Sequence, residues 1–401
     1  MNCSEKEVLQ YVAEEDVKFV RLAFCDVFGR QKNISVLAEE LPRAFQYGVA
    51  FDASAIVGFG DESKSDLILH PEPETLTPLP WRPEHGRVVR MFCHITYPDG
   101  TPFECDTRRI LKKAVEDAKA AGYSFEFGAE QEFYLFELDE NGQPTNHPYD
   151  HAGYMDIAPE DRGENIRREI CLTLEQMGIR PESSHHEEGQ GQNEIDFRYS
   201  DALTAADQAM TFQTVVRTIA ARNGLYADFS PKPIPDMPGN GFHINVSVHP
   251  DSDAAFDGMI AGILARAEEM TAFLNPTEDS YRRLGLRKAP GYISWSKENR
   301  SQLVRVPAVT GGSRRAELRS ADPSSNPYIA FALIIYAAME GISEGKPLPE
   351  AADINFFRVE EAELQGYRRL PGCLEDAKAI AAAGEFVKNH LPEKVARIYC
   401  G

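Results

Sequence analysis

The chain is organised around one polar segment, Ser184-His185-His186-Glu187-Glu188-Gly189-Gln190-Gly191-Gln192-Asn193-Glu194-Ile195-Asp196. Glu187 and Glu194 stand on either side of a turn rich in Gly and Gln, and the segment is too polar to be ordinary core. Gly189 and Gly191 allow the backbone to reverse direction. If one strand leads in and another leads out, both carboxylates face one point. Such oxygen-rich clusters suit Mg²⁺ or Mn²⁺, which are hard cations.

Two further segments supply matching groups. Residues 127–136 predict a strand, whose period of two puts Glu130 and Glu132 on one face. Carboxylates side by side on a sheet repel one another, and a cation between them removes that repulsion. The segment from Gly239 to Ser247 places His243 on an alternating strand just after a glycine-rich turn. This arrangement fits a metal ligand beside a backbone that approaches a substrate closely.

Each segment alone has a simpler interpretation. A pair of Glu residues on a strand is more often part of a solvated sheet face, and a lone His is more often a structural residue. Seven arginines in four short motifs between Tyr281 and Tyr328 favour a functional interpretation: Arg282, Arg283, Arg300, Arg305, Arg314, Arg315 and Arg319. Any one of them fits a surface salt bridge. Together they predict convergence on the carboxylates and an anionic ligand, most simply ATP plus a carboxylic acid. A purely metal-dependent hydrolase does not explain them.

Composition limits the class of protein. The 401 residues include 42 basic and 63 acidic side chains, a net charge of -21, which argues against nucleic acid or an anionic membrane as a partner. The seven cysteines are scattered without a CxxC motif, as in a reduced, cytoplasmic chain. The amino terminus has no signal-peptide pattern, and no apolar run is long enough to span a bilayer.

The pattern of elements predicts an α+β protein of two domains, residues 1–103 and 104–401. The first contains short strands at 17–24, 32–36 and 88–95 and a helix at 38–47. The second contains helices at 108–121, 163–177 and 205–223, each followed by or ending at a glycine, with strands between them. We expect an antiparallel sheet that bears the metal ligands and helices that cover its back.

In their order along the chain these motifs resemble type I glutamine synthetases over nearly the whole length. The matching motifs are Phe51-Asp52-x-Ser54, Glu130-x-Glu132, Ser184-His185-His186-Glu187 to Glu194, Gly241-Phe242-His243, Asn299-Arg300-Ser301, Arg315-x-Glu317-x-Arg319 and Asp322-Pro323-Ser324-x-Asn326-Pro327-Tyr328. The step from Glu187 to Glu194 and the position of Asn245 are similar to the short bacterial subgroup. That subgroup is not adenylylated, and Phe357 stands where the adenylylated form has Tyr.

The resemblance implies a small β-grasp domain, a catalytic domain with a curved antiparallel sheet, and active sites between neighbouring subunits of hexameric rings. It implies two or three Mg²⁺ or Mn²⁺ ions and ATP as co-substrate. It assigns Glu132, Glu187 and Glu194 to one metal and Glu130, His243 and Glu317 to another; Arg283, Arg319 and Gly239 to glutamate; Arg300, Arg305, Arg315 and Ser247 to ATP; and Asp52, Asp66, Tyr154 and Glu187 to ammonium. Catalytic roles fall to Asp52, Arg300 and Arg319.

The implied reaction belongs to nitrogen metabolism and has two steps. The γ-carboxyl of glutamate attacks ATP to give γ-glutamyl phosphate, and an amine then displaces phosphate. Metals and arginines neutralise the charge of the phosphoryl transfer. The second step needs an uncharged amine, so ammonium must lose a proton to a nearby carboxylate.

The chain departs from the family at several places. The flap segment, residues 284–290, is one residue shorter, and Lys288 stands where the family has a Glu that deprotonates ammonium. Pro238 replaces an Asn, Ala55 replaces a Ser, and the chain ends at Gly401 before the helical arm that locks two rings, so we do not expect a stable dodecamer. Three hypotheses follow: a glutamine synthetase, a γ-glutamyl ligase that uses a polyamine, ethanolamine or an alkylamine, and a non-catalytic relative. The metal and phosphate positions favour the first two, and Asp52, Asp66 and Tyr154 favour the first.

Overall fold

The computed structural model describes residues 3–82, 85–308 and 314–401 and contains two compact units. One unit comprises Met1–Ile110 with Leu172–Ile179, and the other Leu111–Cys171 with Arg180–Gly401. Helices α3 (Thr107–Ala120) and α4 (Glu164–Gln176) contribute residues to both. Among the described residues, no helix has the length and apolar character needed to cross a membrane.

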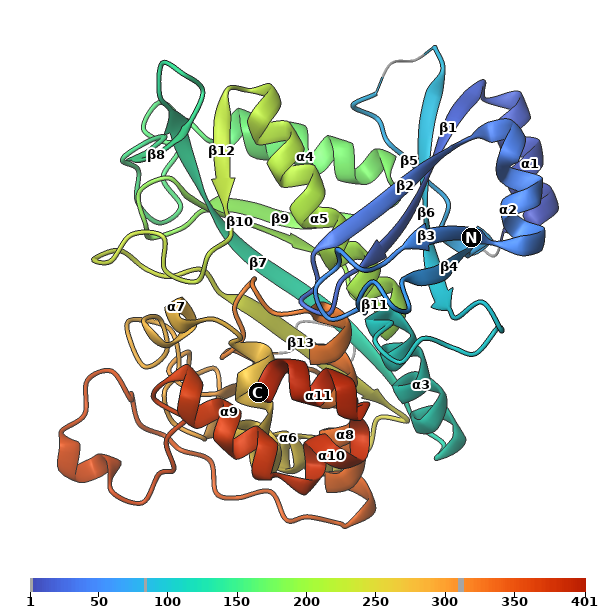
Figure 1. Ribbon diagram of the computed structural model, residues 1–401. Helices are drawn as coiled ribbons and strands as arrows, with labels where there is room; N and C mark the ends of the chain where they lie inside the picture. The colour runs from blue at the N-terminus through green and yellow to red at the C-terminus, as the bar shows by residue number, and fades with distance from the viewer. Residues whose placement is uncertain (1–2, 83–84, 309–313) are drawn as a thin grey trace. The chain divides into compact units, whose positions relative to one another are not determined.

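The N-terminal unit is a six-stranded sheet in the order β2-β1-β6-β4-β3, with β5 paired to β6 (Figure 1). Strands β1 and β6 run parallel, and the other pairs are antiparallel. Phe24 packs against Phe51 with ring centroids 5.0 Å apart, which anchors β3 on the sheet. The elements are α1 (Glu5–Glu14), β1 (Val17–Cys25), β2 (Gln31–Leu37), a 3-10 turn (Ala38–Glu40), α2 (Leu41–Tyr47), β3 (Val49–Asp52), β4 (Asp66–Pro71), a 3-10 turn (Pro73–Thr75), β5 (Thr77–Pro78) and β6 (Arg87–Thr96).

The second unit is built on a ten-stranded sheet whose long central strand is β7 (Ser124–Leu138). The main path runs β14-β15-β16-β13-β7-β10-β9, and all its pairs are antiparallel except β14 with β15. Short strands β8, β11 and β12 also pair with β7. The bounds are β8 (Pro144–Pro148), β9 (Pro181–His186), β10 (Gln192–Phe197), β11 (Ser200–Asp201), β12 (Leu225–Asp228), β13 (Phe242–His249), β14 (Trp295–Lys297), β15 (Val304–Val306) and β16 (Ala316–Leu318).

Helices pack on the sheet through side chains that alternate along its strands. Phe127 of β7 stacks on Phe331 of α8 with centroids 4.3 Å apart, and both residues are buried. Helix α8 begins at Asn326, whose side chain accepts a hydrogen bond from the Tyr328 N–H, with Pro327 in the first turn. The helices are α5 (Ala202–Arg222), α6 (Asp253–Leu274), α7 (Glu278–Tyr281), α8 (Pro327–Ser343), a 3-10 turn (Glu361–Leu364), α9 (Leu374–Ala383), α10 (Glu385–His390) and α11 (Glu393–Cys400).

Helices α6 and α8 lie directly against each other because both carry glycines at their crossing (Figure 1). A Cβ added to Gly262 would lie 2.0 Å from the carbonyl oxygen of Ala337, and one added to Gly341 would lie 2.0 Å from that of Gly258. No side chain fits there. The contact brings two largely apolar helices together behind the strands that carry the acidic residues.

The predicted α+β fold is confirmed, and the strands expected at 17–24, 32–36 and 88–95 and the helices at 108–121, 163–177 and 205–223 are present within a few residues of their expected bounds. Helices back the curved sheet, as predicted. The parallel pair β14 and β15 is the exception to the expected antiparallel sheet. The boundary at residue 103 stays a prediction.

The helix crossing gives a stability prediction. Gly262→Ala should lower the free energy of unfolding by about 1–3 kcal/mol, because the added methyl group forces the backbones of α6 and α8 apart. Thermal or urea denaturation measures this effect. Gly372→Ala is the control, because nothing lies within 4 Å of its added Cβ. A Gly262→Ala protein as stable as the control would contradict this account of the packing.

Candidate active site

The sheet register brings the predicted acidic residues together across neighbouring strands. On β7, Glu130 is paired with His243 of β13 and Glu132 is paired with Glu194 of β10. Further along the sheet, Glu317 of β16 is paired with Asn245 of β13. Directly opposed residues have Cβ atoms about 5 Å apart, so these pairs form one row of polar groups.

Ligand atoms of these residues gather in overlapping groups. In each of three groups the candidate atoms lie within 4.8 Å of one another: Glu130, His243 and Glu317; Glu132, Glu194 and His243; His185, Glu187 and Glu194. All six predicted metal-binding residues are therefore in one connected cluster. Asp196 joins it in a further group with Glu130 and Glu194.

Crowding changes the acidity of these groups. Burial and the nearby charge of Glu187 raise the pKa of Glu132 to about 7. Burial and the neighbouring acids, Asp196 first, raise the pKa of Glu194 well above its ordinary value, and burial with Glu130 raises that of Asp196 to about 6. Burial, followed by the charge of Arg319, lowers the pKa of His243, so its imidazole is neutral and able to ligate a metal.

The donor set fits divalent cations. Carboxylate oxygens with one neutral imidazole are ligands that Mg²⁺ and Mn²⁺ accept. A cation in the cluster would remove the repulsion that raises the pKa values of the carboxyls, and it would stabilise their ionised forms. Glu130, Glu132, Glu187, Glu194, His243 and Glu317 are the residues that would hold such ions.

A buried ion pair between His186 and Asp150 stabilises the turn that carries Glu187. Both ring nitrogens of His186 face oxygen: Nε2 lies 2.8 Å from Asp150 Oδ1 and Nδ1 lies 2.7 Å from the carbonyl oxygen of Glu187. The same Asp150 oxygen accepts a hydrogen bond from the Gly191 N–H at 3.0 Å. One carboxylate therefore fixes both ends of the turn. Sequence reasoning did not assign this pair, although the doubled histidine before Glu187 pointed to it.

Glu187 itself is stabilised in its charged form. Its carboxylate oxygens lie 3.1 Å from His185 Nε2 and 3.0 Å from the backbone nitrogen of Glu188, which donates to it. Burial works to raise the pKa of Glu187, but the His185 hydrogen bond and the charge of Lys288 together hold it below the ordinary value.

A glycine loop, residues 239–241, lies beside the acidic cluster. The Gly241 N–H donates to Glu132 Oε2 at 2.8 Å. Gln192, which sequence reasoning missed, donates from Nε2 to the same oxygen at 3.1 Å and to the Gly239 carbonyl at 3.2 Å. A Cβ on Gly239 would lie 2.9 Å from the Cγ of Arg283, so only glycine allows this approach. The cavity here is lined by Glu132, Glu187, Gly239, His243, Arg283 and Lys288, among others.

Arginines surround Glu317 on the opposite side. Its carboxylate contacts Arg319 Nη1 on one oxygen and lies 2.6 Å from Arg305 Nη1 on the other. Arg315 Nε donates to Asn245 Oδ1 at 3.0 Å, and Asn245 Nδ2 donates to Glu130 Oε1 at 2.7 Å. Within the described residues, the buried Nε atoms of Arg305 and Arg319 have no hydrogen-bond partner. Buried donors of this kind are ready to bind a carboxylate or phosphate oxygen.

The expectation that all seven arginines converge is wrong for two of them. Arg314 pairs with Asp251 and Asp253, at distances of 2.7 Å and 2.6 Å, near the start of α6. Arg282 pairs with Asp279, three residues earlier on α7, at 2.9 Å. Acidic residues close in space or sequence satisfy these two cations at the surface, as the salt-bridge interpretation predicts.

The other predicted residues have different positions. Tyr154 is exposed, with its ring edge-on to His185 at a centroid distance of 5.5 Å, next to the Glu187 turn. Ser247 lies half-buried on β13, and Arg300 is exposed after β14. Asp52 and Asp66 belong to the N-terminal unit, where they are opposed across β3 and β4. The Ser54 N–H donates to Asp52 at 2.9 Å and lowers the pKa of its carboxyl.

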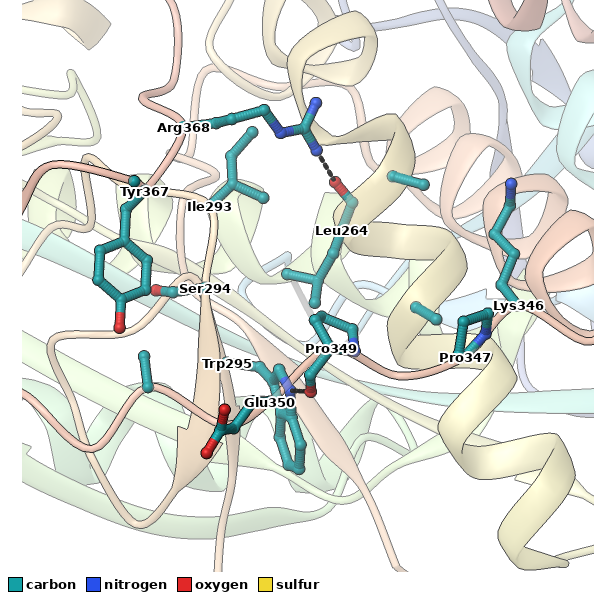
Figure 2. A pocket seen from close by; sticks show the side chains of 14 residues that line it. Leu264, Ile293, Ser294, Trp295, Lys346, Pro347, Pro349, Glu350, Tyr367 and Arg368 are labelled. Carbon is teal, nitrogen blue, oxygen red and sulfur yellow. Dashed lines mark hydrogen bonds between the residues drawn. The ribbon is translucent and has the colours of Figure 1, made fainter.

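A more open pocket lies elsewhere in the second unit (Figure 2). Trp295, Tyr367 and Leu264 line it, with Arg368 Nη2 donating to the Leu264 carbonyl at 3.4 Å. Trp295 Nε1 donates to the Pro349 carbonyl at 2.8 Å. The lining includes none of the six predicted metal ligands, so we place the active site at the acidic cluster instead.

Sequence comparisons identify similar proteins over the full length. A model of the glutamine synthetase catalytic domain matches residues 104–401, and a model of the glutamine synthetase β-grasp domain matches residues 16–98. The second match confirms the predicted β-grasp domain. Glutamine synthetases from Clostridium saccharobutylicum and Methanosarcina mazei are each 44% identical to this chain, over 409 and 411 residues; each alignment covers 98% of this chain and 92% of the relative. A Staphylococcus aureus glutamine synthetase is 41% identical over 406 residues, covering 97% and 91%.

Solved structures have the same fold. A complex of GmaS with ADP is 27% identical with a TM-score of 0.88, covering 100% of this chain and 94% of that one. Plasmodium falciparum glutamine synthetase is 23% identical with a TM-score of 0.86, covering 99% and 94%; at this identity the likeness concerns the fold alone.

The acidity of Glu132 gives a test of the cation site. The pKa of Glu132 is about 7 in the folded protein, and its ordinary value is 4.5. Between pH 4.5 and pH 7 the folded state therefore holds a proton that the unfolded chain has lost. The stabilising contribution of Glu132 is fully present below pH 4.5 and is lost as the pH rises through about 7. In EDTA at about pH 8, Glu132→Gln should therefore raise the free energy of unfolding, by up to about 3 kcal/mol. With saturating Mg²⁺ the order should reverse, because Gln is the poorer ligand.

Thermal denaturation with and without metal measures both effects. Glu137→Gln, an exposed position further along β7, is the matched control and should change little in either condition. A Glu132→Gln protein less stable than wild type in EDTA would contradict the repulsion argument.

Proposed function

The chain belongs to the glutamine synthetase family and is an ATP-dependent ligase, and we propose that the acid and arginine cluster on β7, β10, β13 and β16 carries its synthesis of glutamine from glutamate and ammonium. The predicted similarity to short bacterial enzymes of type I is confirmed, since the relatives include those from Clostridium and Staphylococcus. The connected cluster of five carboxylates and one imidazole is the observation that carries the proposal.

In the proposed reaction a γ-carboxylate oxygen of glutamate attacks the terminal phosphorus of ATP, and the bond to ADP breaks. Ammonia then attacks the acyl carbonyl carbon of γ-glutamyl phosphate, the bond to phosphate breaks, and the nitrogen loses a proton to give the amide. We assign one divalent ion to Glu132, Glu187 and Glu194 and another to Glu130, His243 and Glu317. When bound, these ions supply charge neutralisation for the phosphates. The choice of Mg²⁺ or Mn²⁺, and a third ion, belong to the same proposal.

The cationic and glycine residues have the remaining roles. Arg283, Arg319 and Gly239 hold glutamate, and the free Nε of Arg319 offers a donor to its carboxylate. Arg300, Arg305, Arg315 and Ser247 hold ATP. Catalytic contact with the transferring phosphoryl group falls to Arg300 and Arg319. These positions neutralise charge that grows in the transition state.

Ammonium is the acceptor and needs a base. We propose that Asp52 and Asp66 of a neighbouring subunit meet Tyr154 and Glu187, and that Asp52 takes the proton. The Ser54 N–H donates to Asp52 and lowers the pKa of its carboxyl, so Asp52 is ionised and attracts the ammonium ion to the position where it loses its proton. Such sharing requires a head-to-tail interface, which closes into a ring. The proposal therefore includes hexameric rings of a cytoplasmic enzyme.

A γ-glutamyl ligase for another amine is the second candidate. It is favoured by one observation: the Nζ of Lys288, in place of the family's acidic flap residue, lies 4.6 Å from the centroid of the Tyr154 ring. The acceptor site therefore carries a fixed positive charge where the family has a negative one, as is expected of a site for an acceptor other than ammonium that is uncharged or has its charge away from Lys288.

An acceptor panel separates these functions. The enzyme with ATP, glutamate and Mg²⁺ should release phosphate and form glutamine when ammonium is offered, and less product with methylamine, ethanolamine or putrescine, because each of these is bulkier than the cavity's natural acceptor. Phosphate release and product analysis measure the outcome. Product only with an organic amine would select the second candidate, and no release with any acceptor would select a non-catalytic relative.

Mixed oligomers test the shared site. Asp52→Ala and Arg319→Ala proteins should each be inactive alone. When they are co-refolded in equal amounts, about one quarter of the sites receive both intact residues from different subunits, and that share of activity returns. Turnover, with oligomer mass measured in parallel, checks this. Separate inactive proteins that stay inactive after mixing, in rings that contain both variants, would place Asp52 outside a shared site.

A further inference from the structure

Lys288 places a positive charge at the rim of the cavity that contains the acidic cluster. Its Nζ lies 3.0 Å from Glu188 Oε1 and 4.6 Å from the centroid of the Tyr154 ring. A carboxylate and the face of an aromatic ring are the two kinds of group that attract an ammonium ion. The lysine head group therefore has the environment that a free ammonium ion would seek.

The groups around this head group are fixed by the active-site turn. The Met155 N–H donates to the His186 carbonyl at 2.9 Å, which ties the Tyr154 loop to the end of β9. The Tyr154 ring stands edge-on to His185, which contacts Glu187. Tyr154 and Glu188 therefore keep their positions relative to Glu187 whether or not the lysine is there.

The loop that carries Lys288 is short and closed. The Gly285 N–H donates to the Pro290 carbonyl at 3.3 Å, and Arg287 adopts a φ of 54°. Arg287 Nη2 donates to the Asp236 carbonyl at 2.5 Å, which anchors the loop on its outer side. These contacts fix the backbone of Lys288. Its side chain is 44% exposed and is free to rotate into solvent.

We infer that Lys288 is a specificity-determining residue whose tethered ammonium group occupies the position where the substrate ammonium is taken up. Any acceptor must displace this group. Free ammonium meets charge repulsion from it, and a neutral acceptor does not. The inference rests on the proposed function, because it uses the ammonium subsite assigned to Tyr154 and Glu187. Two unit charges about 4 Å apart in a water-like medium repel enough to weaken binding about fivefold.

The experiment compares a cationic with an uncharged acceptor. Hydroxylamine is largely uncharged near neutral pH and traps γ-glutamyl phosphate as the hydroxamate. In Lys288→Gln, the ratio of the KM for ammonium to the KM for hydroxylamine should fall about fivefold. Lys288→Arg keeps the charge and should keep the wild-type ratio. Arg282→Gln, which removes a nearby cation paired with Asp279, is the matched control and should also keep it.

The ratio separates charge from loop structure, since a distorted loop changes both KM values together. A Lys288→Gln ratio equal to that of wild type, with hydroxamate still formed by the wild-type enzyme, overturns this inference alone. A wild-type enzyme that forms neither glutamine nor hydroxamate overturns the proposed function, and the inference with it.

Discussion

Electrostatic repulsion among carboxylates held on adjacent strands is the constraint on which this structure depends. The register that opposes Glu130 to His243 and Glu132 to Glu194 leaves the acids no room to separate. Burial alone would favour their protonated forms, and crowding adds to that cost. Helices α8 and α6 pack behind the strands, and their backbones touch at the glycine contact. The close packing keeps the strands from moving apart to relieve the repulsion. A rigid scaffold of this kind keeps the acids close enough to share cations.

Positive charge is distributed unevenly around the cluster. Glu317 has two arginines against it, and Glu187 has a histidine and a more distant lysine. Burial, with the charges of the neighbouring acids added to it, raises the pKa values of Glu132 and Glu194. The carboxylates between β7 and β10 therefore have the least compensating positive charge, and a bound cation would stabilise them most. On the other side, the buried Nε atoms of Arg305 and Arg319 have no hydrogen-bond partner in the described part of the chain, so an anion would be stabilised there. A metal–nucleotide complex would supply a cation to the carboxylates and anionic phosphates to the arginines.

Sequence periodicity was sufficient to predict β7 and the helices at 108–121, 163–177 and 205–223, because alternation along a strand and a glycine after a helix are local signals; α6 and α8 were not predicted. The connected cluster of predicted metal ligands followed from the three segments quoted first, together with the arginine-rich segment that contains Glu317. What the sequence could not give was pairing in space. Arg282 and Arg314 carry the same charge as their neighbours, and only their proximity to Asp279, Asp251 and Asp253 removes them from the cluster. Gln192 and the Asp150–His186 pair were missed for the same reason: their partners are far away in sequence, and amide or imidazole groups give no periodic signal.

The proposed site has one part on strands and another on loops. Most of the groups that suit phosphoryl transfer lie on strands: Glu130 and Glu132 on β7, Glu194 on β10, His243 on β13 and Glu317 on β16. The groups that we propose to lie near the acceptor, Tyr154, Glu188 and Lys288, lie on loops or in the turn. Only Glu187, at the first position of that turn, belongs to both parts. A substitution on a strand changes the row of opposed residues and the ions proposed to bind there. A substitution on a loop changes the contact with one neighbouring residue. Among the described residues the loop that carries Lys288 contributes no strand to the sheet, so a substitution there leaves the register of Glu130, Glu132 and Glu194 unchanged.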